Sequence, residues 1–122
     1  MIVAFDYHGV LEISKPLREL AKTLLAGGNE IHIISAISHW QKEEDAKKVI
    51  DSWEIPWHGV HFIHFEGAPT PQVSYRVGKM KAEKMKEISA DVLFDDNEHI
   101  CKAVRDEGLD VVFARGQDRR RP

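Results

Sequence analysis

The sequence predicts a three-layer α/β fold, in which a five-stranded, mainly parallel sheet carries helices on both faces. The first observation is alternation, because five short apolar segments are separated by stretches with helical periodicity. Second, several apolar segments are too continuous for half-exposed strands, as expected for a sheet covered on both sides. Third, 122 residues suffice for one domain with its own core. Strands that alternate with helices favour parallel pairing through right-handed crossovers.

The predicted strands are short runs of β-branched and aromatic residues, each followed by a turn signal or a helical pattern. In chain order they cover residues 2–5, 31–34, 60–65, 92–94 and 111–113.

The predicted helices are marked by apolar residues three or four positions apart. The first has its apolar face between residues 17 and 25, after the capping residue Ser14. The second has its apolar face between residues 46 and 53, behind Ser38 and Gln41, whose spacing matches a capping box.

The third and fourth predicted helices have apolar residues between positions 82 and 88 and between positions 100 and 104. Residues 67–78, which contain two prolines, lack a clear period and are predicted to form a surface loop. We expect residues 1–115 to form one domain and residues 116–122 to form a flexible basic tail.

Composition excludes several classes of protein. A chain that is 43% hydrophobic and 30% charged is typical of a globular domain, which excludes disorder of the whole chain. The sequence has neither a membrane-length apolar run nor a secretory signal, so we expect a cytoplasmic protein with no membrane partner. The single cysteine, Cys101, fits a reducing compartment. The net charge of −3 gives no support for a nucleic-acid partner.

Polar residues come directly after three of the predicted strands. Asp6 follows the first, Ser35 the second, and Asp95 with Asp96 the fourth. Parallel sheets bind ligands beyond the carboxyl ends of their strands, and carboxylates gathered there suit Mg²⁺. Each residue alone has a plainer interpretation, since Asp96 could cap a helix and Asp6 could begin a turn with Gly9. Together they favour a site.

These residues occur in the order of four motifs of a known superfamily. The motifs read DYHGV from Asp6, Ser35 after the second strand, a lysine within KAEKMKEISADVLFDD, and the pair Asp95 and Asp96. Over essentially its whole length the chain resembles a small capless phosphohydrolase of the haloacid dehalogenase (HAD) superfamily. The resemblance implies a Rossmann-like (HAD-like) fold and an Mg²⁺-dependent phosphatase, a hydrolase acting on phosphate monoesters. The motif lysine aligns best with Lys81, and Lys79 is the fallback.

The resemblance implies that Asp6 is a nucleophile that forms an aspartyl-phosphate. His8 stands where the superfamily's phosphatases carry a second aspartate, and three interpretations stay open. Histidine titrates near neutral pH, so His8 could serve as the general acid and base, which is the favoured interpretation. It could instead mark different chemistry, or a catalytically impaired protein that binds a phosphorylated ligand.

The resemblance divides the other candidates into metal ligands, phosphate donors and a supporting carboxylate. The implied Mg²⁺ ligands are Asp6, Asp95 and the backbone carbonyl of His8. Ser35 and Lys81 would bind phosphate oxygens, and Asp96 would act through metal-bound water or through Lys81.

A capless member implies a phosphorylated small molecule or a macromolecular phosphate as substrate, and assembly into a homo-oligomer that covers the site. A receiver-like phospho-acceptor module is a weak alternative, because one acid follows the first strand and Arg115 follows the fifth. A dinucleotide-binding module is disfavoured because the turn after the first strand lacks GxGxxG.

Overall fold

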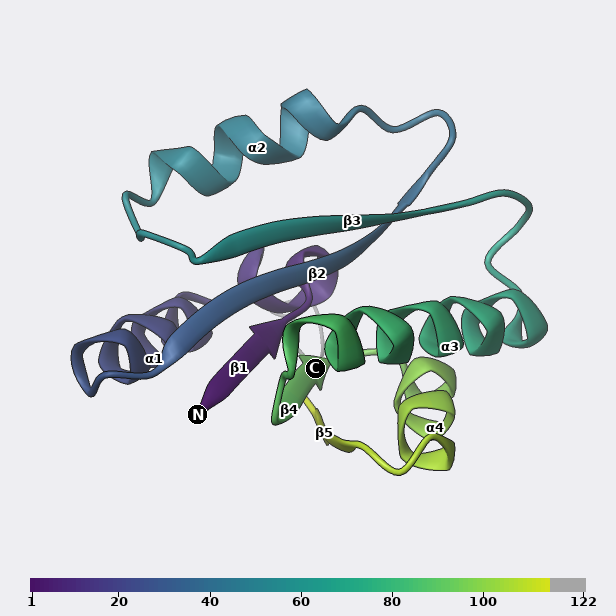
Figure 1. The fold of residues 1–122 in the computed structure, drawn as a ribbon. Coiled ribbons are helices and arrows are strands. Elements are labelled where there is room, and N and C mark those ends of the chain that lie inside the picture. Colours follow the sequence, from purple (N-terminus) through teal and green to yellow (C-terminus); the bar gives the residue numbers. More distant parts are fainter. Residues whose placement is uncertain (115–122) are drawn as a thin grey trace, which may run out of the picture.

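The computed structural model describes residues 1–114, which form one five-stranded sheet with helices on both faces (Figure 1). Every neighbouring pair of strands is parallel, and the strand order is β3-β2-β1-β4-β5. The strands are β1 Ile2–Phe5, β2 Glu30–Ser38, β3 Gly59–Phe65, β4 Val92–Asp95 and β5 Asp110–Phe113. The predicted fold class, a three-layer Rossmann-like α/β fold, is confirmed.

Four helices complete the three layers: α1 Lys15–Ala26, α2 Glu43–Ser52, α3 Pro71–Ile88 and α4 Glu98–Asp106. Apolar residues of α1 and α2 pack with Phe5 and Ile33 on one face of the sheet. Apolar residues of α3 and α4 pack with Ala4 and Ile34 on the other face. Successive strand residues therefore contribute to two separate cores, which is why β1, at the centre of the sheet, is apolar throughout rather than alternating.

The order of the strands reverses between β1 and β4. The chain builds β2 and β3 on one side of β1 and then crosses to build β4 and β5 on the other side. Phe5 pairs with Phe94 at the carboxyl end of this central pair, and the Asp6 amide donates to the Phe94 carbonyl at 2.9 Å. A crevice beyond these strand ends is the usual ligand position in open α/β sheets.

β2 is longer than the sequence pattern indicated. Its pairing with β1 ends at Ile33, but its pairing with β3 continues until Ser38 meets Phe65. We expect from the sequence that Ser35 follows the strand, but the structure places Ser35 inside β2. The extra length makes a two-stranded wall that rises past the carboxyl end of β1.

The predicted loop over residues 67–78 is wrong for residues 71–78, because α3 begins at Pro71. The Thr70 hydroxyl accepts a hydrogen bond from the Val73 amide at 3.2 Å, and Pro71 occupies the first turn. Proline is favoured there because its fixed φ suits the helix and its missing N–H has no intrahelical partner in any case. Lys81 consequently lies in the middle of α3.

The predicted capping box is also wrong. α2 begins at Glu43, and Ser38 is the last residue of β2. The Gln41 side-chain oxygen accepts from the Ser38 amide at 2.7 Å and from its hydroxyl at 2.9 Å, which closes a turn instead of capping a helix.

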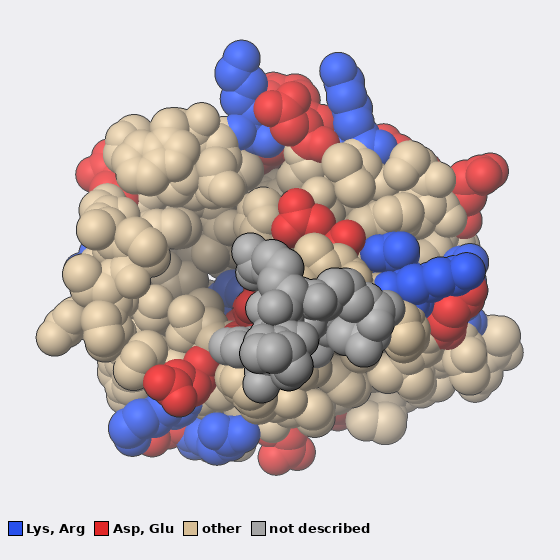
Figure 2. All heavy atoms as spheres, turned by 180° about the vertical axis from the view of Figure 1, so that it is seen from behind, with Lys and Arg blue, Asp and Glu red and all other residues tan. Residues whose placement is uncertain are grey.

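Two further predictions concern a basic C-terminal tail and the absence of a membrane-length apolar run. The predicted basic tail, residues 116–122, and Arg115 lie outside the described residues. Within residues 1–114, none of the helices has the length and apolar character needed to cross a bilayer. On the face seen in Figure 2, acidic and basic side chains are interspersed.

Candidate functional site

A buried lysine joins the carboxyl ends of β1 and β4. Lys81 Nζ donates to Asp6 Oδ1 at 3.1 Å and to Asp95 Oδ2 at 2.7 Å, and all three side chains are almost completely buried. Asp6 follows β1, Asp95 ends β4, and Lys81 reaches them from α3. The pairing satisfies charges that would be costly to bury alone.

Asp96 completes a cluster of three carboxylates. One carboxylate oxygen each from Asp6, Asp95 and Asp96 lies within 4.8 Å of the others. The Asp95 carboxylate also accepts from the Asn97 amide at 3.0 Å. Asn97, in turn, caps α4 by accepting from the first amides of that helix. The start of α4 therefore fixes the acidic pair against the sheet.

A glycine makes room for Asp96. Gly9 has a φ of +74°, and a Cβ built on it would lie 2.0 Å from Asp96 Oδ2. The turn Tyr7–Leu11 thus brings its backbone directly against this carboxylate, in a conformation that favours glycine.

The electrostatics of the cluster follow from burial. Burial raises the pKa of Asp6 well above its ordinary value, Lys81 opposes this rise, and the neighbouring Asp95 and Asp96 add to it. Burial, followed by the charge of Asp95, also raises the pKa of Asp96. For Lys81, burial alone would lower the pKa, but Asp6 and Asp95 reverse the effect and raise it. Lys81 is therefore a permanent cation of the site.

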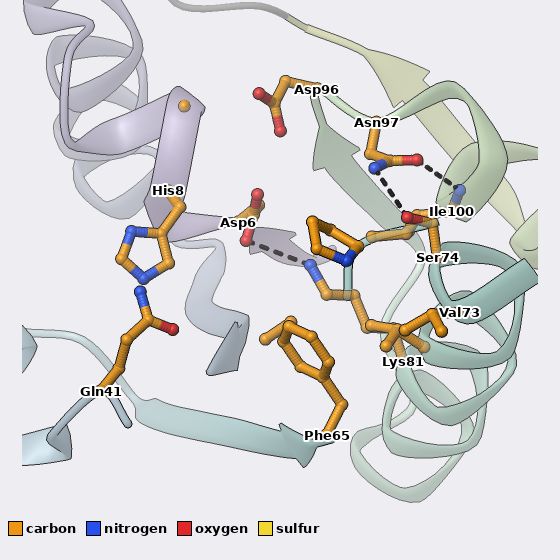
Figure 3. Close-up of a pocket in the computed structure, with 14 residues that line it drawn as sticks. Asp6, His8, Gln41, Phe65, Val73, Ser74, Lys81, Asp96, Asn97 and Ile100 are labelled. Carbon is orange, nitrogen blue, oxygen red and sulfur yellow. Dashed lines mark hydrogen bonds and ion pairs between the residues drawn. The ribbon is translucent and has the colours of Figure 1, made fainter. Parts of the chain in front are cut away.

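Asp6, Lys81 and Asp96 line a cavity of about 300 Å³ (Figure 3), and the fully buried Asp95 lies behind them. This volume is at the lower end of the range of roughly 300–1,000 Å³ that is typical of small-molecule sites. Ala36 and Phe65, from the long β2–β3 wall, form one side. Val73 and Ser74, in the first turns of α3, form another. The N-terminal end of a helix carries partial positive charge and favours anions.

His8 lies at the side of this cavity, next to Gln41 and turned away from the pair of Asp6 and Lys81 (Figure 3). Its backbone is not helical, although it lies within the turn Tyr7–Leu11. The His8 ring is 3.5 Å from a Glu12 carboxylate oxygen and is 38% exposed.

The other predicted site residues separate into two groups. Asp6, Lys81, Asp95 and Asp96 come together as predicted. Ser35 is not among the residues that line the cavity, and its buried hydroxyl has no hydrogen-bond partner among the described residues. The fallback, Lys79, points elsewhere and pairs with Glu107 at 2.7 Å.

The structure adds three polar residues to the cavity that the prediction did not include: Gln41, Ser74 and Asn97. Asn97 Nδ2 donates to Ser74 Oγ at 3.2 Å, which connects α3 to the start of α4 (Figure 3). Asn97 directly follows the acidic pair, so its position was a usable signal. Ser74 carried none, because its segment was predicted to be a loop.

The donor set fits a hard divalent cation. Mg²⁺ prefers oxygen ligands and is usually held by one or two carboxylates plus waters or phosphate oxygens. Asp6, Asp95 and Asp96 supply oxygens only, and Asp96 is the most accessible of the three. Lys81 already compensates one of the charges of the cluster, so a cation would bind next to it.

Comparison with solved structures places the fold among known proteins. No family model matches the chain, and no curated protein matches it. Nineteen chains of solved structures match. Among them is the crystal structure of a universal stress protein in complex with cAMP, with a TM-score of 0.54 and 14% sequence identity. The match covers 96% of this chain and 98% of that one, so it extends over the whole fold.

This comparison contradicts the predicted HAD superfamily membership. The fold matches a universal stress protein over nearly its full length, and no family model supports the four short motifs. Three predictions depended on that resemblance and are therefore also wrong: the phosphatase function, the hydrolase assignment and the aspartyl-phosphate on Asp6. The related alternatives, an impaired HAD-like protein and a receiver-like module, fall as well. At this low identity, the comparison shows the fold alone.

Proposed function

We propose that this protein binds a phosphorylated small molecule together with a divalent cation, Mg²⁺ in the first instance, without chemically changing it. The observation that carries the proposal is the cluster of Asp6, Asp95 and Asp96, of which Asp6 and Asp96 line a cavity. The same cavity is bounded by the first turns of α3. A cation at the carboxylates and an anion bridging it to the helix end would use both features.

Charge decides the order of binding. Three carboxylates and the Lys81 ammonium leave an excess of negative charge, which repels a phosphate group from the empty site. Mg²⁺ removes that excess and offers open coordination positions to phosphate oxygens. The phosphorylated ligand should therefore bind only after the cation.

The cavity also supplies neutral hydrogen-bonding groups. Ser74, Asn97 and Gln41 line it, and polar side chains of this kind orient a ligand in an otherwise apolar pocket. The universal stress protein of similar fold was solved with cAMP, which is itself a phosphorylated small molecule. This supports the same class of ligand for the present chain.

The proposal is tested by titration calorimetry. Mg²⁺ is titrated into the metal-free protein, and AMP and cAMP are titrated with Mg²⁺ and with EDTA. We expect Mg²⁺ binding, ligand binding that requires Mg²⁺, and no release of phosphate. Asp96→Asn should weaken Mg²⁺ binding by on the order of 10-fold or more, because even the loss of a residue that only supports a metal ligand typically weakens metal binding by about that factor. The control, Glu98→Gln, changes an exposed neighbour.

Two results would overturn the proposal: no Mg²⁺ binding at millimolar concentration, or equal binding by both variants. The expected cytoplasmic location, a macromolecular phosphate ligand and assembly into a homo-oligomer stay predictions.

A further inference from the structure

A second cavity, of about 450 Å³, adjoins the first. The two share His8 and Gln41, which line both. The second cavity extends from these residues toward Trp40, over Tyr7 and Ile37. A ligand held by its phosphate in the first cavity therefore has adjoining space for the rest of its structure, on the far side of His8 and Gln41.

The second cavity has an aromatic and apolar wall that suits a flat apolar group, and its other lining residues include the charged Glu12, Lys42 and Asp45. Trp40 is 67% exposed, although tryptophan is usually well buried. Tyr7 and Ile37 are almost fully buried and contribute aromatic and apolar surface beneath it. Trp40 contacts the His39 ring edge-on, with ring centroids 4.4 Å apart, which leaves the tryptophan without a parallel stacking partner among the described residues.

The shared residues suit the link between the two parts of such a ligand. The Gln41 side-chain oxygen is already used by Ser38, so its amide nitrogen is the end that remains for a ligand. The amide end of Gln41 points toward the His8 ring (Figure 3), and both side chains line the two cavities. A ligand that spans both cavities would have the part between its phosphate and its ring next to Gln41 and His8. The Gln41 amide and the His8 imidazole could then form hydrogen bonds with hydroxyl groups of that part.

We infer that the phosphorylated ligand carries a planar aromatic or heteroaromatic ring, as a nucleotide does, and that this ring stacks on Trp40 in the second cavity. The inference rests on the proposed function for the position of the phosphate. It adds the ring, its location and the residues that recognise it.

The test compares AMP with ribose 5-phosphate, which shares the sugar and phosphate but has no ring system. Binding is measured by calorimetry in saturating Mg²⁺, and the quenching of tryptophan fluorescence is followed in parallel. We expect AMP to bind roughly tenfold or more tightly than ribose 5-phosphate, as base stacking on an aromatic side chain provides. Trp40→Ala should remove this preference and most of the quenching. Trp40→Phe should keep much of the preference.

The control is Ile13→Ala, which shortens another exposed apolar side chain, outside both cavities. Equal affinities for AMP and ribose 5-phosphate, or an unchanged preference in Trp40→Ala, would overturn the inference and leave the proposed function standing. Failure of both compounds to bind in Mg²⁺ would instead count against the proposed function and the inference together.

Discussion

Lys81 and Asp95 form a buried ion pair, with 2.7 Å between the ammonium nitrogen and a carboxylate oxygen and at most 1% of either side chain exposed. The pair connects the middle of α3 to the end of β4, at the point where the order of strands reverses. A pair so deeply buried contributes less to stability than its short distance suggests, because both charges lost their hydration on folding. Breaking it, however, leaves an uncompensated charge inside the protein.

Replacing Lys81 should therefore destabilise the fold strongly. We expect Lys81→Met to lower the free energy of unfolding by about 3–5 kcal/mol in EDTA, because Asp6 and Asp95 lose their cation. Mg²⁺ should restore part of this loss. The measurement is urea denaturation with and without Mg²⁺. Lys102→Met, which removes an exposed lysine paired with Asp106, should cost about 1 kcal/mol or less. Equal effects of the two substitutions would contradict this account.

A side chain at Gly9 should disturb the site as well as the fold. Gly9→Ala meets Asp96 Oδ2 at 2.0 Å, whereas Gly28→Ala has a similar positive φ with nothing within 4 Å. We expect Gly28→Ala to cost about 1–2 kcal/mol of strain alone. Gly9→Ala should cost more and should also weaken Mg²⁺ binding. Denaturation and calorimetry on both variants separate the two effects, and normal Mg²⁺ affinity in Gly9→Ala would count against the proposed ligand role of Asp96.

Gly78 should be required for the close packing of α3 on α4. A Cβ there would lie 2.6 Å from the Ala103 Cβ and 2.9 Å from the Ile100 backbone. Gly78→Ala should destabilise by about 1–3 kcal/mol through overpacking, although alanine favours helices. The exposed control on the same helix, Gln72→Ala, should be nearly neutral or slightly stabilising. Thermal denaturation distinguishes them, and a stabilised Gly78→Ala would show that the helices separate easily.

His61 should make stability depend on pH away from the site. Its Nε2 lies 3.1 Å from His32 Nδ1. Burial first, then the neighbouring His32 and Lys84, hold the pKa of His61 below its ordinary value of 6.5, while Glu87 opposes the shift. Between the lowered pKa and 6.5 the unfolded chain binds more protons than the folded chain, so stability falls as pH falls through this window.

Urea denaturation at pH 7.5 and pH 5.5 measures this dependence. His61→Asn should lose less stability on acidification than the unchanged protein. An unaltered pH dependence in His61→Asn would refute the assignment.

The sequence predicted the fold class correctly because the apolar runs and the alternation of strands with helices both indicated a parallel sheet. The continuous apolar runs identified strands that are covered on both faces, and the parallel order then placed Asp6 and Asp95 at one edge of the sheet. Lys81 was found through a motif resemblance, although that resemblance led to the wrong superfamily. Four short motifs specify where polar groups meet on this type of sheet, and they do not specify what the protein does with them.

The errors have local physical causes. β2 continues past Ser35 because Ala36 and Ile37 pair with β3, an interaction that a single segment does not display. α3 begins early because Thr70 and Pro71 act as a cap and first turn, whereas prolines in an aperiodic stretch were interpreted as a loop. Gln41 and Trp40 lie at the cavities only because β2 extends to Ser38 and the turn after Ser38 is closed by the Gln41 side chain.

The long pairing of β2 with β3 has a consequence for the dynamics of the protein. The wall behind the cavity consists of backbone hydrogen-bonded through Ser38 and Phe65, so it is already ordered before any ligand arrives. Binding against such a surface costs less conformational entropy than binding that must first order a loop. Amide hydrogen exchange at Ala36 and Ile37 should then be slow in the ligand-free protein and change little on binding, whereas the turn at Tyr7–Leu11 should take up most of the added protection.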